Sequence, residues 1–364
     1  MAGYSQAELT ALIKDLTGLE GQAKYNISEV IFLNSFKERD VKDDFVMINE
    51  VTNDERQPVF LRQDDWSSFE TLDQGSCKLP TCEIADEWSE FRWKVGKIGC
   101  ELVICMESFT TDFNRFFNTW VKNNEDDVNS AIVQFIAERF QSKHVKAEAR
   151  VYFFADSTVT NKLINSTDGV FSQAIARATA NAELRVEITQ NQGATAEQQM
   201  LTGEQVYNYL AEAYNKMSIT EDFDPSNSSF LVDRQNANAL VGWLNSLADL
   251  KGVSCDCIDP EKVTKSRVFT WDNTTLFGIP LKVYNFQAMM KGAGDPYYDV
   301  ATGLYIHRNV FLLVRNENIL LGYELEETLS SFKIIYDERE EEVVIKGRSK
   351  LAPGLPTDAF IVGY

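Results

Sequence analysis

The chain has 364 residues, 44% hydrophobic and 25% charged, which is typical of a folded protein with about two to three domains. Its 35 basic and 55 acidic residues give a net charge of -20, and this excess argues against sequence-specific binding of nucleic acid. The sequence starts without a basic and apolar leader and has no apolar run of about 18 residues, so we expect folding in a cytoplasm and no membrane span.

A helix is predicted near the start of the chain. Ser5 and Glu8 have the spacing of a capping box, and Leu9, Leu12 and Ile13 follow at helical intervals. No nearby segment offers a cover for this apolar face, so the sequence predicts an arm that a neighbouring subunit covers.

The next segment, residues 44–90, alternates short extended pieces with turn residues and predicts a long β-hairpin. Residues 50–90 contain eleven acidic residues against Arg56, Arg62 and Lys78. Two interpretations remain open. The segment is a solvated loop, which composition alone favours, or it is a flap that lies on a basic surface of another subunit.

Residues 90–106 alternate and then become continuously apolar, which predicts one long strand entering a core. A helix with five aromatic residues is predicted over 108–120. A long amphipathic helix then begins after Asn124, with acidic residues in its first turn and cations at its C-terminal end. A short buried strand is predicted over Val151–Asp156.

Residues 157–305 mix predicted helices and strands, so this region reads as an α/β or α+β module. One helix has a capping box at Thr202 and Gln205, and another follows a strand and is capped by Asp233. A hairpin is predicted around the charged run Asp337–Glu342, and AFIVGY ends the chain as a strand.

Chemical motifs are missing from the sequence. The six cysteines lack the spacing of a zinc knuckle, and Cys100 and Cys105 fall on opposite faces of a strand. His144 and His307 are interpreted as structural residues. Nucleotide-binding, hydrolase and metalloprotease signatures are absent. We therefore predict no catalytic residue, no metal and no cofactor, and a protein that is not an enzyme.

The order of these elements resembles the major capsid proteins of tailed double-stranded DNA phages, the Hong Kong 97-like fold that encapsulins share. The resemblance is carried by EFRWKVGKIGCELVICMESFTTDFNRFFNTW through FIAERF, by SSFLVDRQNANALVGWL, by TTLFGIPLKVYNF and by the ending FKIIYDEREEEVVIKGRSKLAPGLPTDAFIVGY. In the third run, Leu276, Gly278, Ile279 and Pro280 match a strand of the family that carries a Gly-x-Pro step.

The resemblance implies an α+β fold with five parts. These are an N-terminal arm (1–45), an extended β-hairpin loop (46–92), a first part of the peripheral domain with a long spine helix (93–156), an axial α/β domain (157–305) and returning peripheral strands (306–364). It also implies a shell protein of the virion, assembled in the host cytoplasm as hexamers and pentamers around double-stranded DNA that it does not read. Portal, scaffolding and decoration proteins are the implied partners.

We expect the acidic hairpin to lie over a neighbouring subunit and to meet the cations of the long helix. The predicted contact residues are Asp54, Glu55, Asp64, Asp65, Glu70, Asp73, Arg139, Lys143, Lys146 and Arg150. Some members of the family cross-link a loop lysine to a neighbouring asparagine, but Lys78 has no partner that can be aligned, so cross-linking is not expected. Two alternatives are an encapsulin-like nanocompartment with protein cargo and a cytosolic α/β enzyme.

Overall fold

The computed structural model describes residues 4–17, 46–61, 87–120, 128–220, 223–251, 274–324 and 333–364. The fold is α+β, and the chain forms two compact units. The first unit comprises Met1–Val51, Lys94–Val170 and Leu321–Pro353; the second comprises Thr52–Trp93, Phe171–Leu320 and Gly354–Tyr364. None of the described helices is long and apolar enough to cross a membrane.

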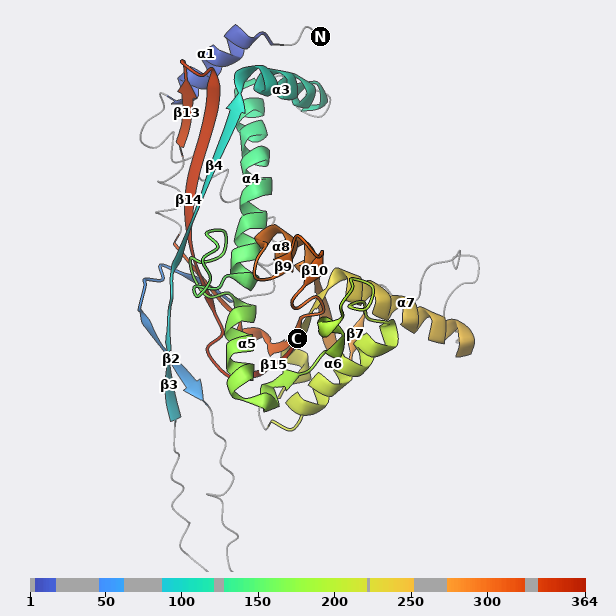
Figure 1. Ribbon diagram of the computed structural model, residues 1–364. Helices are drawn as coiled ribbons and strands as arrows, with labels where there is room; N and C mark the ends of the chain where they lie inside the picture. Colours follow the sequence, from blue (N-terminus) through green and yellow to red (C-terminus); the bar gives the residue numbers. More distant parts are fainter. Residues whose placement is uncertain are drawn as a thin grey trace, which may run out of the picture. The chain divides into compact units, whose positions relative to one another are not determined.

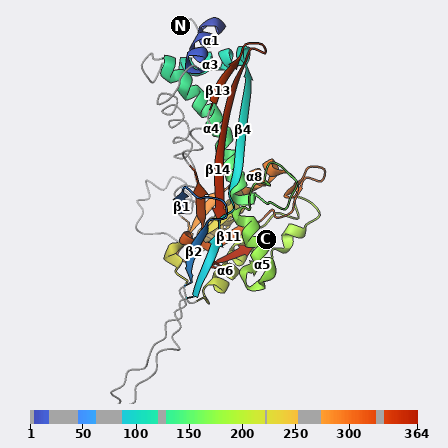
Figure 2. The same cartoon turned by 90° about the vertical axis from the view of Figure 1, so that its left-hand side faces the viewer.

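The first unit is a sheet with helices packed against it (Figure 1). Its helices are α1 (Gln6–Thr17), α3 (Met106–Trp120) and α4 (Val128–Phe154). Its strands are β1 (Val46–Asn49), β4 (Gly96–Cys105), β12 (Leu320–Tyr323), β13 (Lys333–Asp337) and β14 (Glu342–Gly354). The sheet order is β1-β12-β14-β13, and β4 also pairs with β14. Figures 1 and 2 show β4 and β14 as long neighbouring strands that run beside α4.

The N-terminal helix α1 begins at the predicted capping box. The Ser5 amide donates to the Glu8 carboxylate (2.8 Å), and the Glu8 amide donates to Ser5 Oγ (3.3 Å). The predicted lack of a local partner is wrong, because Leu9 and Ile13 are fully buried in one core with α3, α4 and the sheet. The sequence does not indicate this packing, because β13, the sheet strand that α1 contacts, follows α1 by more than 300 residues.

The long helix α4 continues further than the sequence indicated. The strand predicted over Val151–Asp156 is wrong, since Val151–Phe154 form the last turn of α4 and Ala155 N donates to the Val151 carbonyl (3.0 Å). All four side chains of this turn are buried, and such packing overrides the preference of β-branched and aromatic residues for strands. Gly169 lies against this turn, where a Cβ would come within 2.6 Å of the Phe153 carbonyl oxygen.

Two segments that the sequence predicts as extended are divided into strands differently in the structure. The single strand predicted over 90–106 is two strands, because β3 ends at Arg92 and β4 begins at Gly96. The piece FVMINEV was expected in the hairpin, but its strand β1 pairs with β12 in the first unit's sheet. The hairpin over β13 and β14 is confirmed, with Asp337 opposite Glu342 at its turn.

The second unit is built on a six-stranded sheet with the order β5-β15-β11-β6-β8-β7. The strands of the second unit, inside and outside this sheet, are β2 (Arg56–Leu61), β3 (Glu87–Arg92), β5 (Arg185–Val186), β6 (Ser228–Asp233), β7 (Thr275–Leu276), β8 (Ile279–Tyr284), β9 (Tyr298–Asp299), β10 (Leu304–Tyr305), β11 (Phe311–Arg315) and β15 (Phe360–Gly363). Its helices are α5 (Val170–Ala180), α6 (Gly203–Met217), α7 (Arg234–Lys251) and α8 (Phe286–Ala293).

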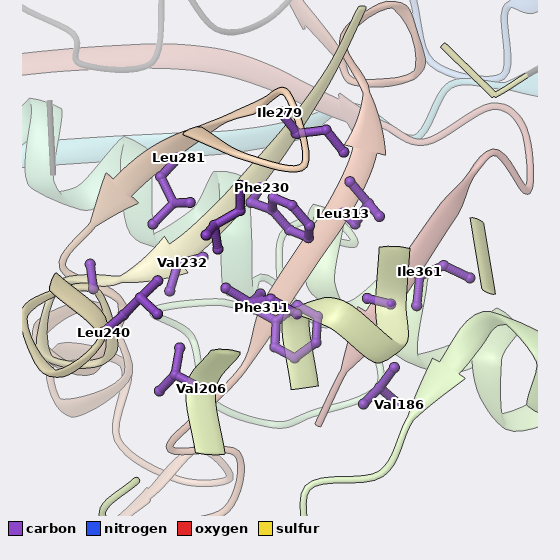
Figure 3. Packing of buried hydrophobic residues seen from close by; sticks show 14 of the residues in the cluster. Val186, Val206, Phe230, Val232, Leu240, Ile279, Leu281, Phe311, Leu313 and Ile361 are labelled. Carbon is purple, nitrogen blue, oxygen red and sulfur yellow. The ribbon is translucent and has the colours of Figure 1, made fainter. Parts of the chain in front are cut away.

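Buried side chains of α6 and α7 pack against one face of this sheet. Figure 3 shows Phe230, Val232, Phe311 and Leu313 from the central strands facing this core, together with Val206 of α6. The capping box of α6 is confirmed, with Gln205 N donating to Thr202 Oγ (3.3 Å) and Thr202 N to Gln205 Oε1 (2.9 Å). The closing strand β15 lies in this sheet beside β11, whereas the resemblance implied that it returns to the peripheral sheet with β13 and β14.

Candidate assembly surfaces

The base of the acidic hairpin is an antiparallel ribbon of β2 and β3. The register runs from Arg56 opposite Arg92 to Leu61 opposite Glu87. Among the described strands, each of the two pairs only with the other. Arg56 and Glu90 form an ion pair across the ribbon (3.0 Å). The hairpin prediction is therefore confirmed at its base, and a two-stranded ribbon of this kind is marginally stable by itself in water.

Asp54 and Glu55, the two predicted contact residues just before β2, differ in the surroundings of their side chains. The Glu55 carboxylate accepts hydrogen bonds from Thr52 N (2.8 Å) and Thr52 Oγ (3.0 Å), so it closes its own turn. Asp54 has a positive φ of 62° and an exposed side chain. The ends of this turn are held by buried Trp93, which donates its amide to the Glu55 carbonyl (3.0 Å) and accepts from Asp54 N (2.9 Å). The other predicted acidic contacts, Asp64, Asp65, Glu70 and Asp73, lie outside the described residues.

The cations of α4 lie in the body of the helix. The prediction that they occupy its C-terminal end is wrong, because the helix continues past Arg150 to Phe154 and its last turn has no basic residue. Its predicted acidic first turn, residues 125–127, lies outside the described residues. The four cations are therefore not available to interact with the negative end of the helix dipole, which acts only on the last turn.

Two of these cations are engaged within their own chain. Arg139 contacts the Asp112 carboxylate of α3, and its guanidinium lies 5.1 Å from the centroid of the Phe135 ring. Arg150 is partly buried, and burial lowers the pKa of its guanidinium below the usual value. Lys143 and Lys146 have exposed side chains. The structure thus brings Arg139 to α3 and leaves Lys143 and Lys146 as the exposed cations of the predicted set.

The histidines occupy buried or partly buried structural positions. His144 is fully buried in the middle of α4, and its Nε2 lies 3.0 Å from Glu148 Oε1. His307 packs edge-on against the Tyr364 ring (5.4 Å between centroids). Burial and the nearby Arg185 lower the pKa of His307 to about 4, so this imidazole is neutral at physiological pH.

The second unit contains a buried polar network that no pattern in the sequence predicts. Asn191 Oδ1 accepts from Asn309 N (3.0 Å) and Asn309 Nδ2 (3.1 Å). The Gln199 side chain donates to the Tyr305 carbonyl (2.7 Å) and accepts from the Tyr305 amide (3.3 Å). Arg308 donates to the Ala196 carbonyl (2.9 Å). These bonds fix irregular loops, because a buried polar group that loses its partner costs about 1–3 kcal/mol.

Asp233 connects two helices in the same unit. Its carboxylate accepts from Gln235 N at the start of α7 (2.9 Å) and from Gln287 N at the start of α8 (3.1 Å). The sequence predicted the first cap and missed the second, since α8 begins more than 50 residues later. Burial raises the pKa of Asp233, and the hydrogen bonds from backbone amides offset part of that increase.

Cys105 of β4 is exposed and has a free thiol. Among the described residues, no group of three His, Cys, Asp or Glu side chains could hold a metal ion.

No protein-family model matches the chain, and no curated protein matches it. Solved structures do resemble it. A chain from Gordonia phage Cozz is 15% identical, with 89% of this chain and 85% of that chain covered and a TM-score of 0.49. A chain of the satellite phage P4 procapsid is 9% identical, covers 92% of this chain and 98% of its own, and has a TM-score of 0.45. A chain from the capsid of cyanophage P-SCSP1u is 13% identical, with 88% and 86% covered and a TM-score of 0.42.

Proposed function

We propose that this protein is the major capsid protein of a tailed double-stranded DNA phage, with the Hong Kong 97-like fold that its sequence resembles. Many copies form hexamers and pentamers of an icosahedral shell, assembled in the host cytoplasm, that encloses DNA without reading its sequence. Portal, scaffolding and decoration proteins are its further partners. The protein acts through association and shape, without catalysis.

The observation that carries this proposal is the acidic hairpin on its two-stranded base. The described base, β2 with β3, joins no other described strand, and the segment over residues 50–90 has eleven acidic residues against three basic ones. A two-stranded ribbon is marginally stable by itself in water, and a neighbouring subunit can supply both contact area and counter-charge. Exposed ion pairs contribute about 0–1 kcal/mol each, so the shell depends on many such contacts repeated around it.

The domain roles are part of the proposal. The first unit, with α4 along its sheet, corresponds to the peripheral domain, and the second unit, with its six-stranded sheet, corresponds to the axial domain. The contact residues remain proposals as well. Exposed Asp54 and the acidic residues of the hairpin would face cations of a neighbour, among which we keep Lys143 and Lys146.

Assembly of the purified full-length chain tests this proposal. Electron microscopy and light scattering should detect closed icosahedral particles, tubes or hexameric sheets. A stable monomer of 41.3 kDa under all assembly conditions would refute a shell protein. In particles from the natural source, DNA inside supports the phage capsid, whereas enzyme cargo without DNA supports the encapsulin alternative.

A matched variant tests the hairpin itself. Replacing residues 62–86 with Asn-Gly connects Leu61 to Glu87, which are opposite each other in the ribbon, through the two-residue loop that such pairs favour. This variant should fold with unchanged helical content and fail to assemble. Normal particles from it would show that the hairpin is dispensable, while leaving the shell function intact.

A further inference from the structure

A row of five aromatic rings runs across α6, α7 and the turn between β7 and β8 in the second unit. In order along the row they are Trp243, Tyr207, Phe277, Tyr214 and Phe223, and we call them the aromatic row. Centroids of adjacent rings lie 4.6–5.8 Å apart. Every residue of the row keeps part of its surface exposed, and all except Phe277 also pack against the buried core of this unit. Because the core holds these rings in place, a partner does not have to order them on binding.

Phe277, in the middle of the row, has a backbone conformation that does not suit its side chain. Leu276 pairs with Ile279, so Phe277 and Gly278 form a two-residue hairpin loop in which both have positive φ, 56° and 81°. Such a loop favours Asn-Gly, and a bulky residue in the left-handed region is an outlier. The Phe277 side chain is 36% exposed, and a Cβ on Gly278 would meet no described residue within 4 Å beyond its chain neighbours. Backbone strain at an exposed aromatic residue on a projecting loop indicates a role in contact.

An exposed carboxylate adjoins each end of the aromatic row. Glu204 stands one helical turn before Tyr207 on the same face of α6, and Asp224 directly follows Phe223. Hydrogen bonds from Ser226 lower the pKa of Asp224 below its usual value, so this carboxylate is charged at neutral pH. The surface therefore combines ring faces with negative charge at both ends.

We infer that the aromatic row is a docking site for a segment of another protein in which lysine or arginine residues flank apolar ones. Aromatic residues dominate the binding energy of protein interfaces, and their ring faces attract cations. The carboxylates at the two ends supply the charge that complements the flanking cations. The net charge of -20 attracts a basic partner, whereas a second copy would bring the same excess of carboxylates. This inference concerns the second unit alone and does not depend on the proposed function.

Peptide binding to the unassembled full-length chain tests the docking site. At about 3.3 Å per residue, the spacing of the rings corresponds to at most about six residues of an extended segment. The probe is therefore a pool of peptides with two arginines at each end and six random apolar residues between them. The control pool has glutamate in place of arginine. We expect the chain to retain members of the arginine pool, identified by mass spectrometry, and none of the glutamate pool; equal retention of the two pools, or none of either, would overturn the inference.

Phe277→Asn separates the role of the ring from the stability of the fold. It removes one ring and gives the loop the residue that it favours, so the melting temperature should stay the same or rise. Binding of the retained peptides should weaken about tenfold, as for an aromatic residue at the centre of an interface. The matched control is Val300→Asn, at an 80% exposed apolar residue of the same unit, and it should leave binding unchanged. Equal weakening in the two variants, or none in Phe277→Asn, would overturn the inference.

Charge neutralisation tests the two ends of the row. Glu204→Gln with Asp224→Asn removes both charges and keeps hydrogen-bond acceptors at both positions. Binding should weaken about fivefold and depend less on salt. The matched control, Glu183→Gln with Glu197→Gln, removes the same charge at exposed residues elsewhere in the unit and should change binding little. An equal loss in this control would show attraction to net charge alone and overturn the inference.

Hydroxyl-radical footprinting distinguishes a second copy of the chain as the occupant. Oxidation of Tyr207, Tyr214 and Phe277 is measured before and after the chain is placed under assembly conditions, and again with the retained peptides. These rings should stay reactive until the peptides are added. Protection that appears on assembly alone would assign the row to a second copy and overturn the inference, while leaving the shell function standing. A chain that never assembles would refute the proposed function and leave the peptide result unaffected.

Discussion

Replacing Asp233 by alanine should destabilise the second unit by about 3 kcal/mol. The carboxylate is 1% exposed and accepts bonds from Gln235 N, Gln287 N and Gln287 Nε2. Alanine removes the cap of α7, which costs about 0.5–2 kcal/mol, and leaves the α8 amide buried without an acceptor, which costs about 1–3 kcal/mol. For a unit of this size the loss lowers the melting temperature by about 6–12 °C.

The assay is urea and thermal unfolding of the unassembled full-length chain, followed by circular dichroism. Thr202→Ala is the matched control, because Thr202 caps α6 through one exposed bond and its loss should cost about 1 kcal/mol. If Asp233→Ala is no more destabilising than Thr202→Ala, then Asp233 does not join two helices and this reasoning is refuted.

The ionisation of Asp233 gives the experiment a pH dependence. Burial raises the pKa of Asp233 in the folded state. At pH values between the pKa of the unfolded chain and that of the folded chain, the folded chain therefore binds more protons, and its stability falls as pH rises. Asp233→Asn keeps one acceptor and removes this ionisation. Its deficit relative to the wild type should therefore be largest at acidic pH and shrink as pH rises, which unfolding at several pH values would measure.

Two further predictions follow from the contacts of single residues. The pKa of His307 is lowered to about 4 in the folded chain, so the unfolded chain binds more protons below pH 6.5. The free energy of unfolding of the wild type should therefore fall by up to about 3 kcal/mol between pH 6.5 and 4. His307→Gln should show less of this loss in acid unfolding curves, and equal curves for the two proteins would contradict the prediction. Arg139→Met should lower the stability of the unassembled chain by about 1 kcal/mol, because the guanidinium contacts Asp112 and Phe135 at a partly exposed site. Assembly lost with unchanged stability would instead place Arg139 in an interface.

Local signals in the sequence predicted local structure well. The boxes at Ser5 and Thr202 and the cap at Asp233 were each read from a few neighbouring residues, and each starts a helix. Such signals depend on backbone amides within one turn, so they need no information about distant segments. The helix predicted over 108–120 from its five aromatic residues is confirmed as α3, and Phe109, Phe113 and Phe117 are buried on it.

Errors arose where a distant segment decides the structure. The turn Val151–Phe154 has the composition of a buried strand, and only the packing on all sides of it keeps it helical. The run before Met106 looks continuously apolar, yet Glu101, Val103 and Cys105 face outward, because the covering helices contact one side of β4 only. Periodicity cannot tell a strand buried on both faces from one that keeps an apolar row exposed.

The counter-charges of the acidic hairpin show the same limit in the candidate site. The four cations of α4 are recognisable in the sequence because they stand within twelve residues of each other, although Arg139 contacts Asp112 of α3 in the structure. In the first unit's sheet, by contrast, charged residues from β13, β14 and β4 lie side by side, and their register, Lys333 beside Lys346 and Lys346 beside Glu101, exists only in the folded sheet. A sequence therefore displays an acidic segment that is contiguous, whereas a pair of cations such as Lys333 and Lys346 becomes visible only when strand pairing brings the two residues into neighbouring positions.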